Sequence, residues 1–393
     1  MATQPSRPAD DSADLARVVD LLAAQVVAQY VSAEQDLIAE VADYARRGLA
    51  APVGSAARLD MLRRMQIAAH RVAAELRSRA TPLARRVTDE ARRSGAAAAL
   101  RTLTRLTGAH PSLLRTLTAP QPEPVTAHAL SSVITMRLDL QRNLEDAATR
   151  VTRFGDDAYR AAVARAAESE IMHGIAPAAA QRGAWDELTS QGITGFQDSR
   201  GRRWNLASYV EMATRTAVQR AYNEAHEARM AAAGISFFTV APHAHPCPLC
   251  RPWEGRVLSS RYPSGETTTQ SALSDVMVTF EVAGTVDQAR AAGLFHPNCT
   301  HTLVPYLPGV TRMPPAPDWT SADERAYRDA QRLRTFERAV RAAKQREQAA
   351  LTPSDRARAR ADVRKAQARV RAHVAATGLL RRPRREQLDL GNG

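Results

Sequence analysis

The chain has 393 residues, enough for two or three domains, and 44% of them are hydrophobic but only 5% aromatic. This composition, rich in alanine, favours helices packed through small side chains over a thick aromatic core. The net charge of +13 suits a polyanionic partner or an acidic protein surface. No apolar run reaches the ~18 residues of a membrane span, and the first residues lack the apolar segment of a signal peptide. We therefore expect no membrane contact, and a reducing cytosol as the place of synthesis and use.

The segment 13–119 is predicted to be an N-terminal helical domain, because its apolar residues recur at helical spacing. A first helix runs to about Arg47, and a second begins near Ser55. Pro82 is expected in the first turn of a further helical piece. Residues 1–12 are polar and contain prolines, which predicts a disordered tail.

The segment 120–310 is predicted to be a central α+β domain, which begins after a proline-rich linker at residues 108–125. Helix returns after the linker and extends to about residue 172, followed by a shorter helix over residues 178–188. Residues 196–204 read as a β-hairpin. A helix then leads into a β-rich run at residues 235–240. The interval from residue 258 to residue 293 is expected to contain mainly loops.

The segment 311–393 is predicted to be a basic helical hairpin and tail. After a proline-rich exit, one helix begins near Ser321 and a second at Pro353, which ends at Gly378. The predicted fold class is thus mainly α. It has long N-terminal helices, a small α+β central domain with a core braced by Cys and His, and a C-terminal helical hairpin.

All three cysteines fall within residues 243–306, and we expect the rest of the chain to be organised around this stretch. Cys247 and Cys250 form a C-x-x-C turn, and His296 and Cys299 form an H-x-x-C turn. Three sulfurs and one imidazole suit tetrahedral Zn²⁺. A site with four protein ligands is closed, so this zinc would be structural; such zinc contributes about 10–16 kcal/mol in small domains.

Further histidines leave the ligand set open. His301 is the alternative to His296, and His243 and His245 are spare imidazoles that could replace it or orient a ligand. A disulfide within the C-x-x-C turn, a redox site and three unrelated buried thiols are the other interpretations. The odd cysteine count and the missing secretory signal argue against the disulfide, and no βαβ context accompanies a redox motif.

The C-terminal part carries most of the positive charge, with 19 Lys/Arg and 9 Asp/Glu from residue 321 to 393, a net of +10. The candidate phosphate-contacting residues are Arg356, Arg358, Arg360, Arg364, Lys365, Arg369, Arg381, Arg382, Arg384 and Arg385. Aromatic residues for stacking on bases are nearly absent there, so any contact would be non-specific and salt-sensitive. The alternative is a solvated hairpin whose arginines pair with Asp and Glu or with an acidic partner.

Several motifs occur in a specific order over residues 209–310. They are Arg215-Thr216, Arg220-Ala221-Tyr222-Asn223, the C-x-x-C turn, Trp253-Glu254-Gly255-Arg256-Val257, His296-Pro297-Asn298-Cys299, and the ending from His301 to Val310. Together they resemble the phage minor capsid family of Mu protein-F-like head morphogenesis proteins, and the ending resembles its branch called phage minor capsid protein 2. That family often ends His-Pro-Asn-Cys-Arg-Cys, whereas here the last cysteine position is His301.

The resemblance implies a minor structural component of a tailed-phage head and no catalytic residues. The partners it implies are the portal protein and the major capsid or scaffold proteins, with double-stranded DNA held through phosphate contacts. The implied location is the virion head near the portal, and the host cytoplasm during assembly.

Two enzymatic functions in head maturation remain as alternatives. A zinc-braced nuclease would use His243 or His245 as general base beside a carboxylate-held metal. A Cys/His peptidase would use one thiolate with His296 as its base. No second metal set is visible in the sequence, and the peptidase nucleophile would lie in a ligand-spaced pair, so we expect no enzyme. A third alternative is a helical DNA-binding protein driven only by the basic C-terminus. Trp253 is expected to fill the core rather than recognise a partner.

Overall fold

The computed structural model describes most of the chain and divides it into two compact units. The described residues are 9–48, 56–113, 117, 131–152, 179, 183, 185, 189, 196–197, 203–204, 206–242, 247–296, 299, 301–313 and 318–388. Unit 1 contains Met1–Ala23, Ala84–Leu140 and Met212–Arg328, and unit 2 contains Ala24–Leu83, Gln141–Glu211 and Asp329–Gly393. Each unit draws on three separate segments, whereas the sequence-predicted domains are consecutive along the chain; those domain boundaries stay a prediction.

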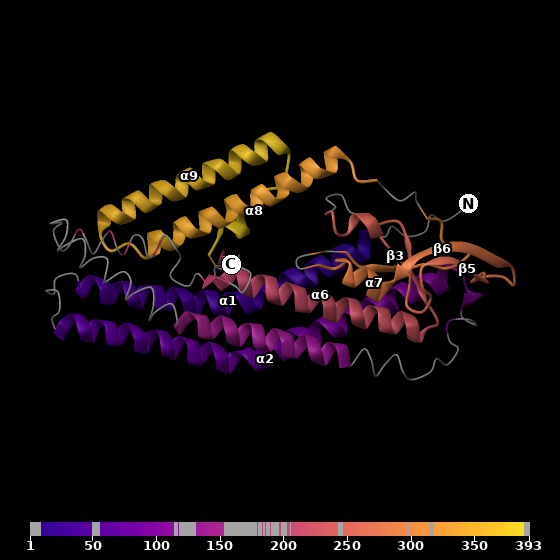
Figure 1. Cartoon of the computed structure of the whole chain (residues 1–393), viewed down its shortest axis with the longest axis horizontal. Coiled ribbons are helices and arrows are strands. Elements are labelled where there is room, and N and C mark those ends of the chain that lie inside the picture. The colour runs from indigo at the N-terminus through magenta and orange to yellow at the C-terminus, as the bar shows by residue number, and fades with distance from the viewer. Residues whose placement is uncertain are drawn as a thin grey trace. The chain divides into compact units, whose positions relative to one another are not determined.

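Two long helices begin the described chain (Figure 1). Helix α1 spans Ala9–Gly48, so it begins inside the predicted disordered tail, and helix α2 spans Ala56–Ala109 without a break. The sequence predicts several pieces in place of α2, because Pro82 lies within it. Proline has no N–H, so Pro82 cannot donate the helical hydrogen bond to the Ser78 carbonyl. Both residues are exposed. Water can bind that carbonyl, which explains why the helix continues.

Within α1, the stretch Ala13–Arg47 is long and apolar enough, by length and composition alone, to span a membrane. In the structure many of its apolar side chains are buried, although Leu21 is exposed. Val26, Val27 and Tyr30 are fully buried, and the Tyr30 hydroxyl donates a hydrogen bond to the Leu144 carbonyl (3.1 Å). The buried core helix of a protein can be as long and as apolar as a membrane-spanning helix. The expectation that the chain makes no membrane contact stays a prediction.

Unit 1 contains a mixed five-stranded sheet. Its strands are β3 Phe237–Val240, β4 Val257–Ser259, β5 Gly265–Gln270, β6 Met277–Thr285 and β7 Leu303–Pro305. Their order is β5-β6-β4-β3-β7; β4 and β6 are parallel, and the other neighbours are antiparallel. Helix α6, Leu206–Ala232, precedes β3, and the short helix α7, Val286–Ala291, follows β6. The sheet thus receives the chain just before and just after each cysteine-bearing turn.

The β5–β6 hairpin takes the place of the loop-rich interval predicted after residue 258, so that prediction is wrong. A strand signal is nevertheless present, because residues 267–269 and 277–282 are rich in β-branched and aromatic side chains. The other predicted elements of this unit are found: α6 and β3 lie within a few residues of their expected positions.

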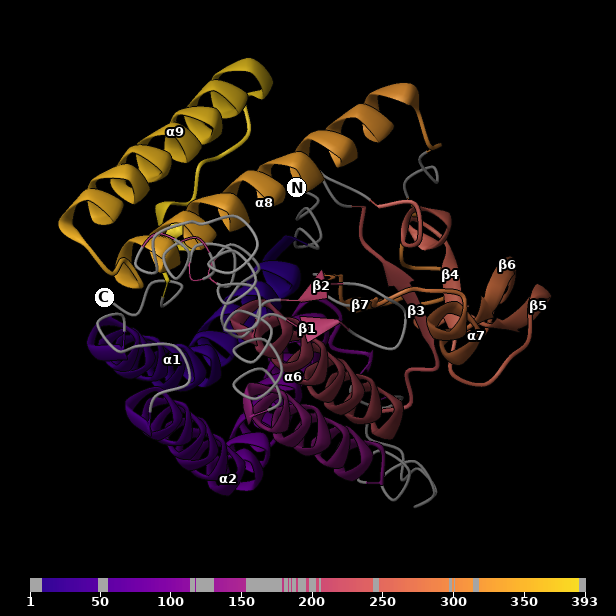
Figure 2. The ribbon, with the colours of Figure 1, turned by 60° about the vertical axis from the view of Figure 1, so that its left-hand side comes forward.

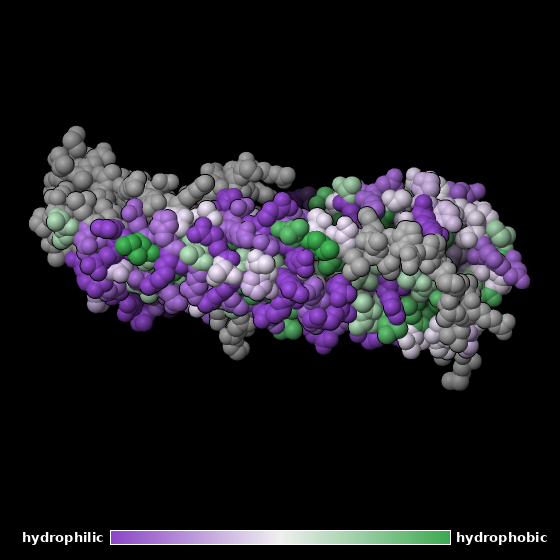
Figure 3. Space-filling view, turned by 90° about the horizontal axis from the view of Figure 1, so that it is seen from below, coloured by the Kyte–Doolittle hydropathy of each residue, from purple (hydrophilic) through white to green (hydrophobic). Residues whose placement is uncertain are grey.

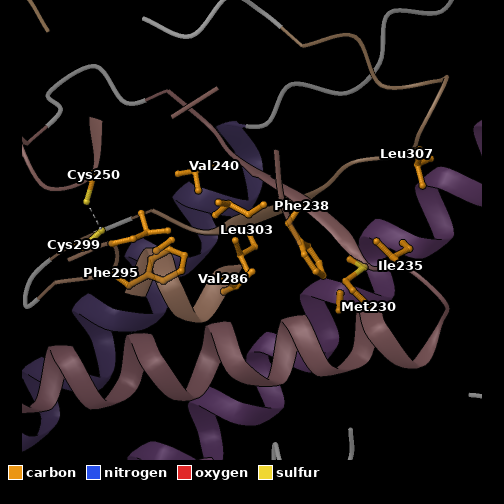
Figure 4. Packing of buried hydrophobic residues seen from close by; sticks show 14 of the residues in the cluster. Met230, Ile235, Phe238, Val240, Cys250, Val286, Phe295, Cys299, Leu303 and Leu307 are labelled. Carbon is orange, nitrogen blue, oxygen red and sulfur yellow. Dashed lines mark hydrogen bonds between the residues drawn. The ribbon is translucent and has the colours of Figure 1, made fainter. Parts of the chain in front are cut away.

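A hydrophobic core fills unit 1 between the sheet and the helices (Figure 4). Phe238 of β3, Met230 of α6 and Val286 of α7 are buried in it. Cys250 and Cys299 belong to the same cluster. The two turns that carry these cysteines are therefore part of the core rather than surface loops.

Helices α2 and α6 approach each other closely at Gly95. A Cβ atom at this position would lie 2.1 Å from the backbone oxygen of Tyr222. Tyr222 is fully buried, and its hydroxyl contacts Asp14 at 3.4 Å. Asp14 also pairs with Arg101 at 2.5 Å. Gly95 therefore allows the backbone contact that sets the depth of α6 in unit 1.

Unit 2 contains most of the predicted C-terminal hairpin (Figure 1). Its helices are α8, Ser321–Gln348, and α9, Pro353–Thr377. Leu333 and Val340 of α8 share a buried cluster with Val370 of α9. The predicted helical hairpin is thus present, with its apolar seam between the two helices.

A second core of unit 2 joins α1 and α2 to the turn between α8 and α9. Ile38, Met65 and Trp185 are buried together, and the Trp185 indole donates a hydrogen bond to the Ala349 carbonyl (2.8 Å). Trp185 lies within the predicted helix at residues 178–188, most of which falls outside the described residues. This core fixes the α8–α9 turn within the unit.

The remaining predicted elements are described in part. Strand β1, Phe196–Gln197, pairs antiparallel with β2, Arg203–Trp204, which confirms the predicted hairpin; its turn lies outside the described residues. Residues 131–152 are helical, as predicted after the linker, and the expected continuation to residue 172 also lies outside them. The mainly α fold, with a small α+β part and a Cys/His cluster, is confirmed.

The face seen in Figure 3 is largely hydrophilic, with hydrophobic residues scattered singly over it. Helix α2 shows the same pattern, since its exposed large apolar side chains include the well-separated Ile67 and Leu100. Single exposed apolar residues are ordinary on protein surfaces and identify no partner.

The close approach at Gly95 predicts an unusual response to alanine. Gly95→Ala should lower the free energy of unfolding of unit 1 by about 1–3 kcal/mol, because the new methyl group meets backbone that cannot move aside alone. Gly108→Ala in the same helix is the control, since nothing lies within 4 Å of its position; it should be neutral or stabilising by up to about 1 kcal/mol. Urea unfolding of both variants measures the difference. Equal stability of the two would contradict the close contact.

Candidate metal centre

The first half of the site is the turn that carries Cys247 and Cys250. The Cys247 carbonyl accepts hydrogen bonds from the amides of Cys250 (3.2 Å) and Arg251 (3.0 Å), which reverses the chain. The two sulfur atoms lie within 4.8 Å of each other. The 3-10 helix η1, Arg251–Trp253, follows directly and leads the chain back toward β4.

The second half of the site follows α7. Gly293 and Phe295 both have positive φ, 110° and 60°. The left-handed region is uncommon for a large side chain and costs of order 1–3 kcal/mol, so the surroundings must hold it. Phe295 is buried in the core beside Cys299 (Figure 4), and the Cys299 amide donates a hydrogen bond to the His296 carbonyl (2.9 Å). Core packing thus imposes the backbone conformation that leads into this turn.

The two turns meet through their sulfur and imidazole atoms. The sulfurs of Cys250 and Cys299 are 3.6 Å apart (Figure 4), and the Cys247 sulfur is 2.9 Å from Nε2 of His296. The Cys299 sulfur is 3.2 Å from Nδ1 of His301. The ligand atoms form two overlapping groups, each within 4.8 Å, that share Cys250. All five predicted ligand residues, His301 included, therefore belong to one continuous cluster.

Hydrogen bonds within the cluster stabilise two thiolates. The hydrogen bond from Cys250, assisted by the one from His296, lowers the pKa of Cys247 to about 4. The bonds from Cys250 and His301 hold the pKa of Cys299 well below its ordinary value. The pKa of Cys250 itself is raised, because its single thiol proton is shared between the other two sulfurs, which favours the protonated form. Thiolates are the form that binds a metal ion, so the cluster is electrostatically suited to a divalent cation.

A chain of polar groups with little solvent exposure holds His301. Its Nε2 lies 2.8 Å from Oε1 of Glu254, which is fully buried. Arg251 donates one hydrogen bond to Oε2 of Glu254 (2.8 Å) and pairs with Asp323 (2.9 Å). Histidines that bind metal through one nitrogen commonly donate the other N–H to a carboxylate. The arrangement leaves Nδ1 of His301 directed at the cysteines.

These contacts also change the ionisation of His301 and Glu254. Burial disfavours the imidazolium, but the hydrogen bonds to Cys299 and Glu254 outweigh it and raise the pKa of His301 to about 9. Burial likewise disfavours the Glu254 carboxylate, whereas His301 and Arg251 hold its pKa below the usual value. A positive charge at His301 and a negative one at Glu254 therefore stabilise each other.

The other residues singled out from the sequence are placed as follows. His243 and His245 lie outside the described residues. Trp253 is partly buried and packs against the core cluster of unit 1, in the role expected of it. The donor set therefore consists of three thiols and two imidazoles, which is the chemistry that zinc prefers.

Two contributors to the site escape the sequence analysis: the ion pair of Arg251 with Glu254, and Asn223. The Asn223 side chain on α6 donates a hydrogen bond to the His301 carbonyl (3.4 Å). Glu254 and Asn223 both fall in the family-like motifs, which was the available signal. Their roles could not be assigned without knowing that both residues contact His301, which lies far along the chain.

The candidate phosphate-contacting residues lie on α9 and on the segment that contains the 3-10 helix η2, Pro383–Glu386, both in unit 2. Several of them are already in ion pairs. Arg360 pairs with Glu347 (2.7 Å), and Arg381 pairs with Glu386 (2.6 Å), which is buried. The tail segment is thus partly folded back on itself and not a free basic arm over the described residues.

One row of arginine side chains on α9 remains available for contact with phosphates. Arg356, Arg360 and Arg364 are exposed, follow each other at four-residue spacing and line one shallow groove. Arg356 and Arg364 make no ion pair with the described part of the chain. Successive members of the row are about 6 Å apart along the helix axis. The row presents its guanidinium groups to one side of α9.

A family model described as phage minor capsid protein 2 matches residues 16–375. The match includes both turns of the Cys/His cluster, nearly all of the two N-terminal helices and most of the C-terminal hairpin. It therefore extends well beyond the residues 209–310 that carry the motifs. Neither the comparison with curated proteins nor that with solved structures found a match.

The buried contacts of Glu254 predict its contribution to stability. Glu254→Gln should lower the free energy of unfolding of unit 1 by about 2–4 kcal/mol, because Arg251 keeps its charge and His301 loses a charged acceptor. Glu324→Gln on α8 is the control, since its ion pair with Arg328 is exposed; it should cost less than about 1 kcal/mol. Urea unfolding measures the stability of both variants, and hydrogen exchange measures the opening of unit 1 in each. A Glu254 variant as stable as the control would show that the polar chain does not support the site.

Proposed function

The chain belongs to the phage minor capsid protein 2 family, and we propose that it is a structural component of the head that acts in assembly next to the portal. Membership makes it a minor capsid protein of the virion. The observation that carries the structural role is the continuous cluster of three cysteines, His296 and His301, which reaches from the half-buried Cys247 to Cys250 and Cys299 in the core of unit 1. Four such donors complete a tetrahedral site, which leaves no position for water or substrate.

We propose that zinc occupies this cluster. The residues fit the ion: two thiols are held as thiolates, and a buried imidazole has its second nitrogen fixed by Glu254. His301 is the better oriented of the two imidazoles, whereas His296 lies beside Cys247 at the half-buried side. Bound zinc supplies a cross-link between turns that are far apart in sequence. The chain's own residues pre-position the donors and exclude water.

One observation favours a second candidate, the Cys/His peptidase. The Cys247 sulfur lies 2.9 Å from Nε2 of His296, and its pKa is lowered to about 4, as in an activated nucleophile. The same thiolate cannot serve both roles, because a metal-bound sulfur is not a free nucleophile. For the nuclease alternative, the candidate bases His243 and His245 lie outside the described residues.

The proposed partners are the portal protein and the major capsid or scaffold proteins, with the phage head as the site of action. The support is the family and its role in the virion. A structural role also agrees with the long helices of both units, which offer extended surfaces to neighbours in an assembly. Assembly would take place in the host cytoplasm.

Head assembly tests this function directly. The chain is produced together with its phage's portal and major capsid proteins, and heads are purified. We expect the wild-type chain to remain with portal-containing particles and Cys299→Ser to be lost from them, because the turn at His296 is no longer held. Wild-type protein absent from the particles, or a Cys299 variant incorporated normally, would be incompatible with the proposal.

The stability of the same variant separates ligand loss from simple core damage. Cys299→Ser should destabilise unit 1 by on the order of 5 kcal/mol, since structural zinc is worth more than one core contact. Ala289→Ser is the control: it places a hydroxyl in the same buried cluster without removing a ligand, and should cost about 1–3 kcal/mol. Comparable losses in the two variants would point to packing alone.

We further propose that the row of Arg356, Arg360 and Arg364 contacts phosphates of double-stranded DNA. The row lies where the chain is most basic, and the ion pair of Arg360 with Glu347 is exposed and therefore easily exchanged. The hairpin has few aromatic residues, so the contact would be through charge and without base preference.

The salt dependence of DNA binding tests the row. Replacing its three arginines with glutamine should lower the slope of log K against log[salt] by about 2–3, since each phosphate contact contributes about 0.9. The control replaces Arg63, Arg77 and Arg86 of α2, which are exposed and make no ion pair with the described residues, so the change in net charge is the same. Fluorescence anisotropy with duplex DNA measures both. Equal slopes for the two triple variants would assign the binding to net charge.

A further inference from the structure

Strand β5 is an unpaired edge of the unit 1 sheet. It hydrogen-bonds to β6 on one side, and no other described strand lies on its far side. Figure 2 shows it at the outer margin of the sheet. At six residues it is twice as long as β7, the strand at the opposite edge. A strand edge carries a row of backbone donors and acceptors that can pair with another chain.

The hydrogen bonds of the hairpin show which residues face this free edge. The Ser271 amide donates to the Val276 carbonyl (2.8 Å), and the registered pairs continue from there along β5 and β6. In an antiparallel ladder the hydrogen-bonded pairs alternate, so the odd-numbered residues of β5 bond to β6. Glu266, Thr268 and Gln270 therefore direct their backbone N–H and C=O groups outward. The side chains of these three residues are exposed as well.

The edge lacks the features that usually prevent strand addition. β5 contains no lysine, proline or bulge, and its register with β6 is continuous. The opposite edge strand, β7, is only three residues long and contains Pro305, whose nitrogen cannot donate. The two edges of the same sheet thus differ, and β5 is open to pairing from Glu266 to Gln270. Just beyond it the Ala272 amide already donates a hydrogen bond to the Pro308 carbonyl (2.9 Å), which limits the free edge at that end.

We propose that β5 is the contact through which two copies of this chain associate, by antiparallel pairing of β5 with β5. In the register centred on Thr268, that residue faces its own counterpart. Glu266 then lies opposite Gln270 of the second copy, so no two carboxylates meet across the new ladder.

The hairpin is acidic, so a second copy fits at this edge in a register that keeps the carboxylates apart, as the pairing of Glu266 with Gln270 does. Residues 262–285 contain Glu266, Asp275 and Glu281 and neither Lys nor Arg, although the whole chain carries +13. Two copies can therefore approach along the hairpin without bringing their basic surfaces together. The new ladder also provides Thr–Thr and Glu–Gln cross-strand pairs, which are favourable or neutral in antiparallel sheets.

The test is sedimentation of the full-length chain over concentrations up to about 100 µM, a range that detects weak dimers. We expect a reversible dimer of the wild-type protein. Thr268→Pro should raise its Kd by about tenfold or more, because it removes an outward N–H and leaves the backbone bonds between β5 and β6 in place. It also removes the side-chain hydrogen bond of Thr268 to Thr279 of β6 (2.9 Å), so Thr268→Val, which loses only that bond, is the control and should leave the Kd unchanged. Circular dichroism and thermal unfolding confirm that each variant is folded.

A pair of opposite charge changes at one position tests the register. Gln270→Lys should lower the dimer Kd by about threefold, because lysine then faces Glu266 of the second copy twice across the symmetry axis, in competition with Asp275, which Gln270 contacts within its own hairpin (2.6 Å). Gln270→Glu should raise it by a similar factor. Repulsion between net charges predicts the reverse order, since lysine adds to an already positive chain. A monomeric wild type, a dimer insensitive to Thr268→Pro, or the reverse order of the two Gln270 variants would overturn the proposal.

Discussion

The sulfurs of Cys250 and Cys299 lie 3.6 Å apart although the residues are 49 positions apart in sequence. The strands between which this contact forms are short: β4 and β7 contain three residues each, and strands of that length pair only weakly by themselves. The loops that carry the cysteines would be free to separate without a further connection. The contact between the two turns therefore joins the ends of β3, β4 and β7, together with the hydrophobic core in which both turns lie. Everything else in unit 1 packs around the sheet of these strands.

Helix α6 explains why a motif far from the cysteines belongs to the same structure. Tyr222 faces Gly95 of α2, and its neighbour Asn223 donates a hydrogen bond to the His301 carbonyl. Arg215, about two turns further back on α6, pairs with Asp20 of α1 at 2.5 Å. These residues connect the N-terminal helices to the Cys/His turns within unit 1. The motif on α6 thus has a positioning role and need not touch a ligand.

The helices were largely predictable, because apolar residues at helical spacing recur over many turns in α1, α8 and α9. Pro82 was a misleading stop signal, since an exposed proline can be accommodated where water replaces the lost hydrogen bond. The hairpin of β5 and β6 was missed because its exposed face carries Thr, Glu and Gln, which resembles a loop in composition.

Four candidate donors, Cys247, Cys250, His296 and Cys299, follow from two local spacings, C-x-x-C and H-x-x-C, whereas His301 lies outside both. The polar groups that support them were not predictable in this way. Glu254 contacts His301 from 47 positions away, and nothing in the local sequence shows that this carboxylate is buried. The choice between His296 and His301 also depends on such distant partners. Local spacing therefore identified the donors, and tertiary packing assigns their roles.

Metal analysis of the full-length chain, purified under reducing conditions and combined with X-ray absorption at the zinc edge, measures the central interaction. We predict about one zinc per chain, bound by three sulfurs at about 2.3 Å and one nitrogen at about 2.0–2.1 Å. The opposite result would be a fully folded, metal-free protein whose three thiols all react with an alkylating reagent. That result would contradict a metal cross-link between the two turns.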